Sequence, residues 1–144
     1  MTPNFTTEEA ISNWIQFSVG NTTTIDYGSP SLFQAMLDSV REALAGTAYR
    51  ELPIAIGETG WPTQGDQYNL ASVENARSFN QNLIDIAKSA DYELYLFELF
   101  DESAKVNESP DLETQVEPHW GIYGLDEALT GMNAIYEKYG IDFQ

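Results

Sequence analysis

The stretch IAIGETGWP, residues 54–62, runs from an apolar segment into a glutamate and then into Thr-Gly-Trp-Pro. Residues 52–56 form a short apolar run bounded by turn-forming residues, which is typical of a strand covered on both faces of a parallel sheet. Glu58 comes just after this run. Because parallel α/β proteins carry their chemistry at the carboxyl ends of strands, we expect a functional carboxylate here.

Helix and strand patterns alternate on both sides of this stretch. Two amphipathic helices are predicted, one capped by Ser31 and one by Ser72, since apolar residues recur at three- and four-residue spacing after each cap. The run LYLFELF is strand-like, as is ISNWIQFSV near the start of the chain. The predicted elements are strand 11–19, helix 31–46, strand 52–56, helix 72–90, strand 94–100 and helix 128–139. This order predicts an α/β fold whose parallel strands are joined by right-handed helical crossovers.

Length and composition limit the class of protein. At 144 residues the chain fits a single domain, 1–144, and is shorter than the roughly 250 residues of a full (β/α)8 barrel. Its hydrophobic content of 42% indicates a globular chain, and no apolar stretch reaches the ~18 residues of a membrane span. The first residues lack the pattern of a signal peptide, so we expect a cytosolic, already trimmed or excised chain.

Charge and cysteine content narrow the choice of partner. The net charge of −17 makes nucleic acid and anionic membrane surfaces poor partners and favours a neutral or cationic one. The chain has no cysteine, which excludes disulfides, thiolate metal sites and thiol catalysis. The acids Glu108, Asp111, Glu113 and Glu117 match no calcium-binding loop, and we interpret them as a solvated loop. No cofactor and no metal site are therefore predicted.

Acids follow two neighbouring predicted strands. Glu58 lies after the first strand, Asp101 and Glu102 lie after the second, and Glu98 shares a side with Glu102 by the alternation of a strand. Glycosidic cleavage needs carboxylates in a cleft, one to protonate the leaving oxygen and one to attack the anomeric carbon or activate water. Trp61 offers a flat face for a sugar ring. Two alternatives stay open: the acids are simply solvated at loop starts, or Trp61 anchors the core.

Several segments, taken in order, resemble one enzyme family. IGETGWPTQGD, ASVENARSFNQNLI, LYLFELFDESAK and EPHWGIYG, with the earlier SPSLFQAMLDSVREAL, are similar to the C-terminal part of family 17 glycoside hydrolases, the β-1,3-glucanases and related glucanosyltransferases. The resemblance covers roughly residues 14–125. It implies a partial (β/α)8 TIM barrel of about the last three βα units and a retaining mechanism with two glutamates. It also implies β-1,3-glucan as the ligand and an extracellular or cell-wall location.

The resemblance also implies roles for individual residues. Glu58 in GETGWP matches the nucleophile. Glu102 and Lys105 in FELFDESAK match the acid and the lysine that line the cleft, and Glu117 in EPHWGIYG matches a further active-site acid. A lysine among these carboxylates would favour the ionised, attacking form of the nucleophile. The positions expected to stack against a sugar ring are Trp61, Phe100 and Trp120, and for Trp120 a structural role is an equal alternative.

The acid/base glutamate of the family has no match here. It belongs to a Gly-Asn-Glu motif at the end of the fourth strand, whereas Gly20-Asn21 is followed by Thr22, and the chain is expected to begin near the sixth strand. We therefore expect the missing strands and their acid to come from a complementing barrel half or from a homo-oligomer. Local substitution by Glu98 or Glu102 is a minor alternative. A non-catalytic β-glucan-binding or assembly fragment is the second interpretation of the whole chain.

Overall fold

The computed structural model describes residues 32–65, 70–90, 92–107, 115–126 and 128–144. The strand predicted at 11–19 and the acids Glu108, Asp111 and Glu113 lie outside these ranges. The chain forms two compact units, Met1–Ile54 and Ala55–Gln144, and each is described by itself. Among the helices in the described ranges, none combines the length and the apolar character that a membrane span requires.

In the first unit, α2 (Leu32–Ala45) is the amphipathic helix that the sequence predicts. The side chain of Leu37 is buried, whereas Met36 and Val40 on the predicted apolar stripe are 61% and 47% exposed. Thr47 closes the helix, because its backbone N–H and its hydroxyl both donate to the carbonyl oxygen of Leu44. The predicted helix is thus confirmed, with only part of its apolar stripe covered.

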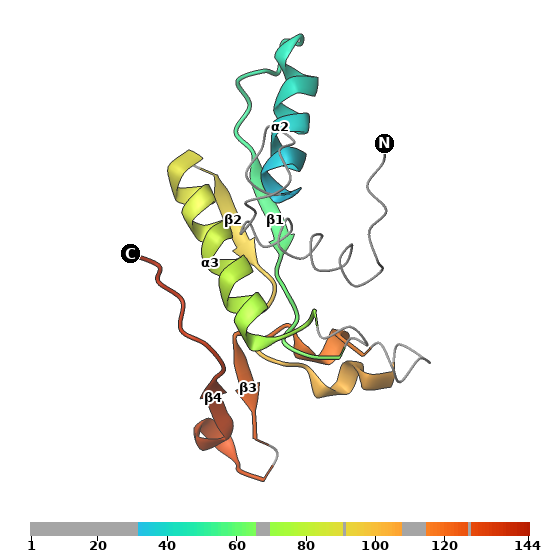
Figure 1. Cartoon of the computed structure of the whole chain (residues 1–144), viewed down its shortest axis with the longest axis vertical. Coiled ribbons are helices and arrows are strands. Elements are labelled where there is room, and N and C mark those ends of the chain that lie inside the picture. The colour runs from blue at the N-terminus through green and yellow to red at the C-terminus, as the bar shows by residue number, and fades with distance from the viewer. Residues whose placement is uncertain (1–31, 66–69, 91, 108–114, 127) are drawn as a thin grey trace, which may run out of the picture. The chain divides into compact units, whose positions relative to one another are not determined.

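The second unit begins with two parallel strands joined by a helix (Figure 1). β1 (Ala55–Thr59) and β2 (Glu93–Leu96) pair in parallel, and α3 (Val73–Ala90) connects them. Ala55 lies opposite Glu93 and Thr59 opposite Leu96, so β1 holds one more residue than β2 over the same span. The α/β class with parallel strands, which the sequence predicts, is confirmed in this unit.

Both strands lie at other residues than their apolar runs indicate. β1 begins at Ala55 rather than at residue 52 and includes Glu58, which the sequence places after the strand. β2 ends at Leu96, so Glu98 is not in a strand and Asp101 does not come directly after one. A strand extends where a partner backbone runs alongside it, and local apolar content does not determine that position. The alternation of a strand therefore cannot explain how Glu98 lies relative to the acids that follow.

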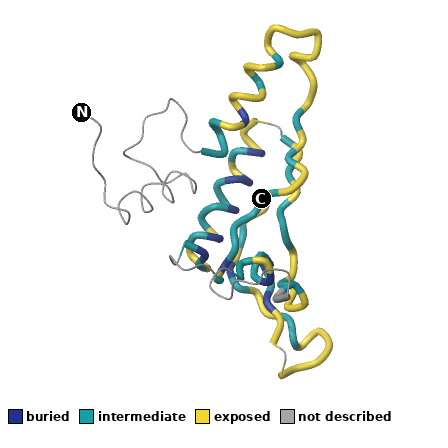
Figure 2. Tube along the Cα trace, turned by 90° about the vertical axis from the view of Figure 1, so that its right-hand side faces the viewer, coloured by how far each residue is buried: buried dark blue, intermediate teal, exposed yellow. Residues whose placement is uncertain are grey.

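α3 is held by its cap and by one buried face. The Ser72 hydroxyl accepts a hydrogen bond from the backbone N–H of Asn75 at 3.1 Å, which makes it the predicted cap. Buried positions recur along the helix at three- and four-residue spacing, as the dark blue segments in Figure 2 show. These buried residues are Ala76, Asn80, Leu83, Ile84 and Ala87. The prediction of this helix is confirmed.

The helix predicted at 128–139 is wrong. The chain there forms a short 3-10 helix, η3 (Gly131–Ala134), and then a strand, β4 (Ile135–Glu137). β4 pairs antiparallel with β3 (Tyr123–Leu125), as Figure 1 shows. Instead of continuing as a helix, the segment returns along an earlier part of the chain.

Local residues explain why this segment is a hairpin. Gly131 has a φ of +66°, a left-handed backbone conformation that interrupts a right-handed helix. The β-branched Ile135 and the aromatic Tyr136 that follow favour a strand. Asp126 closes the turn, since its backbone N–H donates to the carbonyl oxygen of Ala134 at 2.7 Å. In the hairpin, the backbone of Ile135 and Tyr136 is paired with β3, and their side chains favour a strand over a helix.

The core of the second unit joins α3 to the residues around β3 and β4. Its buried members are Ala76, Ile122 and Tyr139, and Trp61, Leu96, Tyr123 and Ile141 pack against them. Within it the amide of Asn80 donates to the hydroxyl of Tyr139 at 2.8 Å, which gives the buried polar residue of α3 a partner. Burial raises the pKa of Tyr139 to about 12.

Candidate active site

Glu58 lies on an irregular part of β1. Ile56 pairs with Leu94 and Thr59 pairs with Leu96, so Gly57 and Glu58 form a bulge opposite a single residue of β2. The side chain of Glu58 is exposed. A bulge changes the direction of the side chains within it and is common beside active sites. The structure therefore presents this carboxylate to solvent from a strand backbone.

Two backbones approach closely just after Glu58. The carbonyl oxygen of Thr59 accepts a hydrogen bond from the N–H of Phe97 at 2.7 Å. A Cβ atom at Gly60 would lie 1.8 Å from the carbonyl oxygen of Phe97, so only glycine fits there. This contact carries the GETGWP segment past the end of β2. The segment of Glu58 and the chain that leaves β2 therefore lie at one edge of the sheet.

Glu98, Glu102 and Lys105 form an acid–lysine cluster on the chain that leaves β2. Lys105 Nζ lies 3.5 Å from Glu98 Oε2 and makes an ion pair with Glu102. The 3-10 helix η1 (Ser103–Asn107) brings them together, since the N–H of Lys105 donates to the carbonyl oxygen of Glu102 at 3.0 Å. The ammonium also lies 4.7 Å from the centre of the Phe97 ring, a cation–π contact. Two predicted site residues thus meet, and Glu98 joins them.

The two carboxylates of this cluster have different environments. Glu98 is 15% exposed, and its Oε1 is buried with no hydrogen-bond partner in the described part of the chain. Burial raises the pKa of Glu98, the hydrogen bond with Glu102 raises it further, and Lys105 opposes the rise. The hydrogen bond from Lys105 lowers the pKa of Glu102, and the hydrogen bond with Glu98 lowers it further. The hydrogen bond to Glu102 in turn raises the pKa of Lys105. Burial therefore favours the neutral form of Glu98, and the hydrogen bond with Lys105 favours the charged form of Glu102.

The tryptophans near the cluster are packed residues. The ring of Trp61 lies 5.1 Å from that of Phe79, and its indole N–H donates to the carbonyl oxygen of Leu70 at 2.9 Å. These contacts are those of a core anchor, the alternative that the sequence left open, and sugar stacking by Trp61 stays a prediction. Trp120 packs edge-on against Phe97 at 5.9 Å. Within the described residues its buried indole N–H has no hydrogen-bond partner.

Phe100 and Glu117 lie on two further segments of the same unit. Phe100 is exposed, forms a parallel bridge with Tyr123, and has its ring 5.9 Å from the tyrosine ring. Glu117 is the exposed first residue of the 3-10 helix η2 (Glu117–His119), which lies against η1. Both side chains are accessible, and their roles toward a substrate stay predictions.

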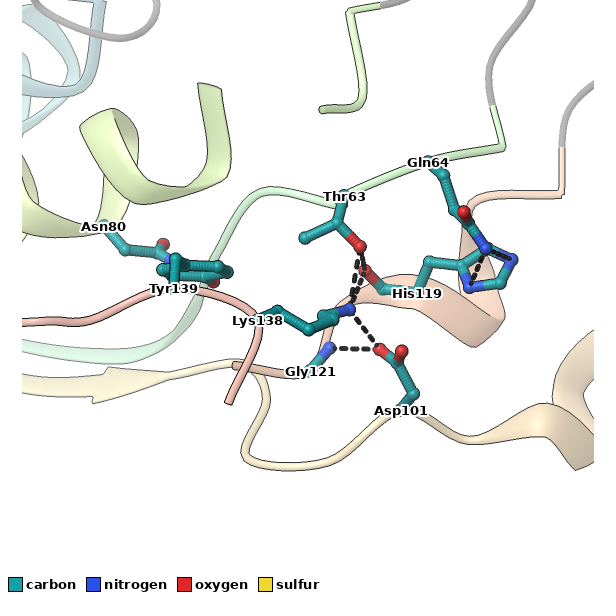
Figure 3. A network of polar contacts seen from close by, with 8 residues as sticks. All are labelled: Thr63, Gln64, Asn80, Asp101, His119, Gly121, Lys138 and Tyr139. Atoms are coloured by element: carbon teal, nitrogen blue, oxygen red, sulfur yellow. Dashed lines mark hydrogen bonds and ion pairs between the residues drawn. The ribbon is translucent and has the colours of Figure 1, made fainter. Parts of the chain in front are cut away.

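A further charged group, which no local sequence pattern indicates, lies in the same unit. Lys138 Nζ lies 2.7 Å from Asp101 Oδ1 and 2.7 Å from Thr63 Oγ1, as Figure 3 shows. The sequence places Lys138 on a helix that does not form, and it places Asp101 among the exposed acids of a rim. The one signal in the sequence that could have pointed to Lys138 is the scarcity of cations, since the chain has six basic residues against 23 acidic ones.

Metal ligands are not assembled in the described ranges. No group of three or more acidic or histidine side chains there is placed to hold a metal ion. His119, the one histidine of the chain, has its Nδ1 3.0 Å from the side-chain nitrogen of Gln64. Burial lowers the pKa of His119, Asp101 opposes this, and Lys138 adds to it. The lowered pKa favours the neutral imidazole, which can accept a hydrogen bond from the amide of Gln64.

Comparison with known proteins connects this geometry to a family. The model of glycosyl hydrolases family 17 matches residues 2–141. The chain belongs to glycosyl hydrolase family 17. The resemblance carried by GETGWP and the later motifs is thereby confirmed, as is the similarity to glycosidases. The family match is also longer than the roughly 14–125 covered by the motifs alone.

Relatives in family 17 include glucan endo-1,3-beta-glucosidases of plants. One from Vitis vinifera is 38% identical over 103 residues, which make up 67% of this chain and 28% of the relative. Acidic isoform PR-O from Nicotiana tabacum is 33% identical over 109 residues, 69% of this chain and 63% of the relative. The chain thus spans less than two thirds of the length of these relatives.

Solved structures of family 17 share the fold of part of their chain with this one. The β-1,3-glucanosyltransferase from Rhizomucor miehei is 25% identical, with a TM-score of 0.50, and the match covers 78% of this chain and 36% of that one. An active-site mutant of the same transferase, in complex with laminaritriose, is 26% identical with the same TM-score.

Proposed function

We propose that this chain is part of a glycoside hydrolase that cleaves β-1,3-glucan with retention of configuration, and that Glu58 is its nucleophile. The observation that carries the proposal is the parallel pairing of β1 with β2. It brings the strand of Glu58 beside the segment that holds Glu98, Glu102 and Lys105. Membership of family 17 supports the reaction class, and the names of the plant relatives support the glucan.

The proposed reaction has two steps. The Glu58 carboxylate attacks the anomeric carbon while the bond to the leaving oxygen breaks, which forms a glycosyl-enzyme ester. Water then hydrolyses this ester, or a second glucan accepts the sugar. The exposure of Glu58 on its bulge supports access by a sugar. Lys105 supplies a positive charge beside the strand ends, and its hydrogen bond with Glu102 lowers the pKa of that carboxyl.

Substrate contacts are proposed for the residues around the two strand ends. Phe100 offers an exposed ring on which a sugar face can stack. The carboxylates of Glu102 and Glu117 offer acceptors for sugar hydroxyls. Trp61 is half-buried with its N–H satisfied by the backbone, so its proposed contribution is the part of the ring that stays accessible.

The rest of the active site is proposed to come from outside the described residues. The described sheet of β1 and β2 has two strands, which supports the interpretation of residues 1–144 as one domain with about the last three βα units of a (β/α)8 barrel. A complementing barrel half or another copy would supply the remaining strands and the general acid, a group worth about 10²–10⁴-fold in rate. Glu98, whose pKa is raised by burial, is the local alternative for that acid. The proposed location is extracellular or in the cell wall.

The test is the release of reducing sugar from laminarin by the purified chain and by a Glu58→Gln variant. The substitution removes the nucleophile while keeping the shape of the side chain, so we expect the rate to fall by about 10³-fold or more. Glu74→Gln, an exposed glutamate of α3, is the matched control and should keep the full rate. A glucoside with fluorine at carbon 2 should leave a sugar ester on Glu58, which mass spectrometry of peptides would locate.

Other outcomes decide between the alternatives. Cleavage that survives Glu58→Gln contradicts the assignment of the nucleophile, and a chain that releases no sugar contradicts activity of the chain alone. Binding of laminaritriose without turnover would favour a non-catalytic glucan-binding role. Neither binding nor turnover would favour an assembly role without sugar chemistry.

A further inference from the structure

The ammonium of Lys138 joins three segments of the second unit that are far apart in sequence (Figure 3). It donates to Thr63 Oγ1 at 2.7 Å, to Asp101 Oδ1 at 2.7 Å and to the carbonyl oxygen of His119 at 3.5 Å. A lysine ammonium has three N–H donors, and here each of them has an acceptor on a different segment. Lys138 is therefore a junction of these segments.

The acceptors are also bonded to one another. Thr63 donates to the carbonyl oxygen of His119 twice, from its backbone N–H at 2.9 Å and from its hydroxyl at 3.0 Å. Asp101 Oδ1 accepts a second hydrogen bond from the backbone N–H of Gly121 at 2.9 Å. The junction therefore holds backbone as well as side chains, and a shift of one segment would break bonds on the others.

The joined segments are those that carry the proposed site. Thr63 ends the segment GETGWPT, Asp101 directly precedes Glu102, and His119 belongs to EPHWG. The backbone N–H of Glu102 donates to the carbonyl oxygen of Pro118 at 3.2 Å, which ties the start of η1 to the same place. Fixing Asp101 thus fixes the backbone from which Glu102 reaches the lysine of the cluster.

Burial makes the junction specific for one arrangement. The side chains of Lys138 and Asp101 are 6% and 17% exposed. Charges withdrawn from water are stable only when they are paired and hydrogen-bonded, so the segments must meet as they do for this pair to exist. A pocket of about 220 Å³ lies beside the pair and is lined in part by Gln64 and Tyr136. The segments therefore have space to shift if the pair is lost.

We propose that Lys138 and Asp101 are positioning residues for the acid–lysine cluster of Glu98, Glu102 and Lys105. Lys138 holds Asp101 in place, and Asp101 sets where the adjoining Glu102, which the turn of η1 keeps beside Lys105, lies relative to Glu98. The inference rests on the proposed function for its catalytic meaning, whereas the placement of the cluster is measurable without any sugar. A failure of the Glu58→Gln test would therefore leave this inference standing.

The test is a titration of the glutamate side chains, followed by carbon-13 NMR in the full chain. In the unaltered chain Glu98 titrates above the ordinary glutamate value because of burial, and Glu102 titrates below it because of Lys105. Lys138→Met is expected to bring the two midpoints closer, because Glu98 and Glu102 lose the hydrogen bond between them, which raises the pKa of Glu98 and lowers that of Glu102. Lys138→Arg keeps a cation that can pair with Asp101 and is expected to restore most of the separation.

Controls separate positioning from stability. Lys88→Met removes an exposed lysine of α3 and should leave both midpoints in place. If Lys138→Met does not fold, the double variant Asp101→Asn/Lys138→Met, which leaves no unpaired buried charge, carries the same expectation. Unchanged midpoints in a folded variant would mean that the pair only stabilises the unit, and this result would overturn the proposal.

Discussion

The ring of Trp61 contacts Phe79, and its N–H donates a hydrogen bond to the carbonyl oxygen of Leu70. Replacing Trp61 should therefore lower the stability of the fold more than it lowers the affinity for a sugar. We predict that Trp61→Ala lowers the free energy of unfolding by about 3 kcal/mol, the usual range for a large aromatic side chain in a core. Trp61→Phe keeps a ring but loses the hydrogen bond, and should cost about 1 kcal/mol. Urea unfolding followed by circular dichroism measures both changes.

An exposed aromatic residue serves as the control for this prediction. Tyr49→Ala in the first unit should change the free energy of unfolding by no more than about 0.5 kcal/mol. If Trp61→Ala had an equally small effect while laminaritriose binding was lost, the ring would be a sugar-stacking surface and the core interpretation would be wrong.

The buried carboxyl of Glu98 gives the unfolding free energy a definite pH dependence. Its pKa is raised in the folded chain above the ordinary value of 4.5, so the folded state binds this proton more tightly than the unfolded state does. The stability that comes from Glu98 is therefore complete below pH 4.5 and is lost as the pH rises through the raised pKa. We predict that Glu98→Gln, which cannot ionise, gains stability relative to the unaltered chain between pH 4 and pH 7.

Comparing two chains isolates this effect, because His119 and the other titrating groups are common to both. Urea unfolding at a series of pH values gives the difference directly. Glu74→Gln on the exposed face of α3 should give a difference that stays flat with pH. A Glu98→Gln difference that falls as the pH rises would mean that the carboxyl is ionised and stabilised by Lys105 instead.

At the scale of elements, the β3–β4 hairpin leads into Lys138 and its junction. A substitution of Gly131, in the turn of this hairpin, tests whether the segment is a hairpin or a helix. In a helix, replacing glycine with alanine adds about 1 kcal/mol of stability, whereas at a φ of +66° the added Cβ costs about 1 kcal/mol. We predict that Gly131→Ala lowers the free energy of unfolding by about this amount. The sign of the change, measured by urea unfolding, decides between hairpin and helix.

A second glycine provides the matched control. Gly140→Ala lies outside the left-handed region, and its new Cβ would have its nearest neighbour at 3.9 Å from Glu137 Oε1. It should be neutral or slightly stabilising, because alanine restricts the unfolded chain. A stabilising Gly131→Ala would contradict the hairpin and restore the helix that the sequence predicts.

Local signals explain which elements the sequence predicts well. α2 and α3 were predictable because a cap and a repeating apolar stripe lie within each helix itself. β1 was displaced by three residues, since its position depends on where β2 runs beside it and on a bulge at Gly57 and Glu58. The prediction of the last helix is wrong because the left-handed Gly131 and the pairing with β3, which lies outside the segment, outweigh an ambiguous apolar spacing.

The candidate site divides in the same way. Glu58, Glu102 and Lys105 were identified from contiguous motifs, and the last two meet within one turn of η1. The junction at Lys138 depends on three segments and on a hairpin that the sequence did not predict. Its residues carry no local pattern, so only the assembled backbone shows that a buried pair forms.

At the scale of the whole molecule, the described sheet favours association of copies of the chain, whereas the overall charge opposes it. β1 and β2 form a two-stranded parallel sheet, and strand edges without partners favour pairing with another chain. The net charge of −17 repels copies of the chain from one another. Association should therefore depend on salt, which screens charge over ~30 Å at 0.01 M but only ~8 Å at 0.15 M.

We predict that the 16.1 kDa chain is closer to a monomer at low salt and forms a dimer or larger assembly at about 0.15 M NaCl, with a mass that rises with protein concentration. Light scattering over a series of concentrations at both salt levels measures this. Salt acts through screening, so matched ionic strengths of NaCl and KCl should give the same masses. A monomer at every concentration and salt level would exclude completion of the sheet by further copies and leave a complementing barrel half as the proposed source of further strands. An assembly that also cleaves laminarin, with cleavage lost in Glu58→Gln, would mean that copies of the chain supply one another with the general acid.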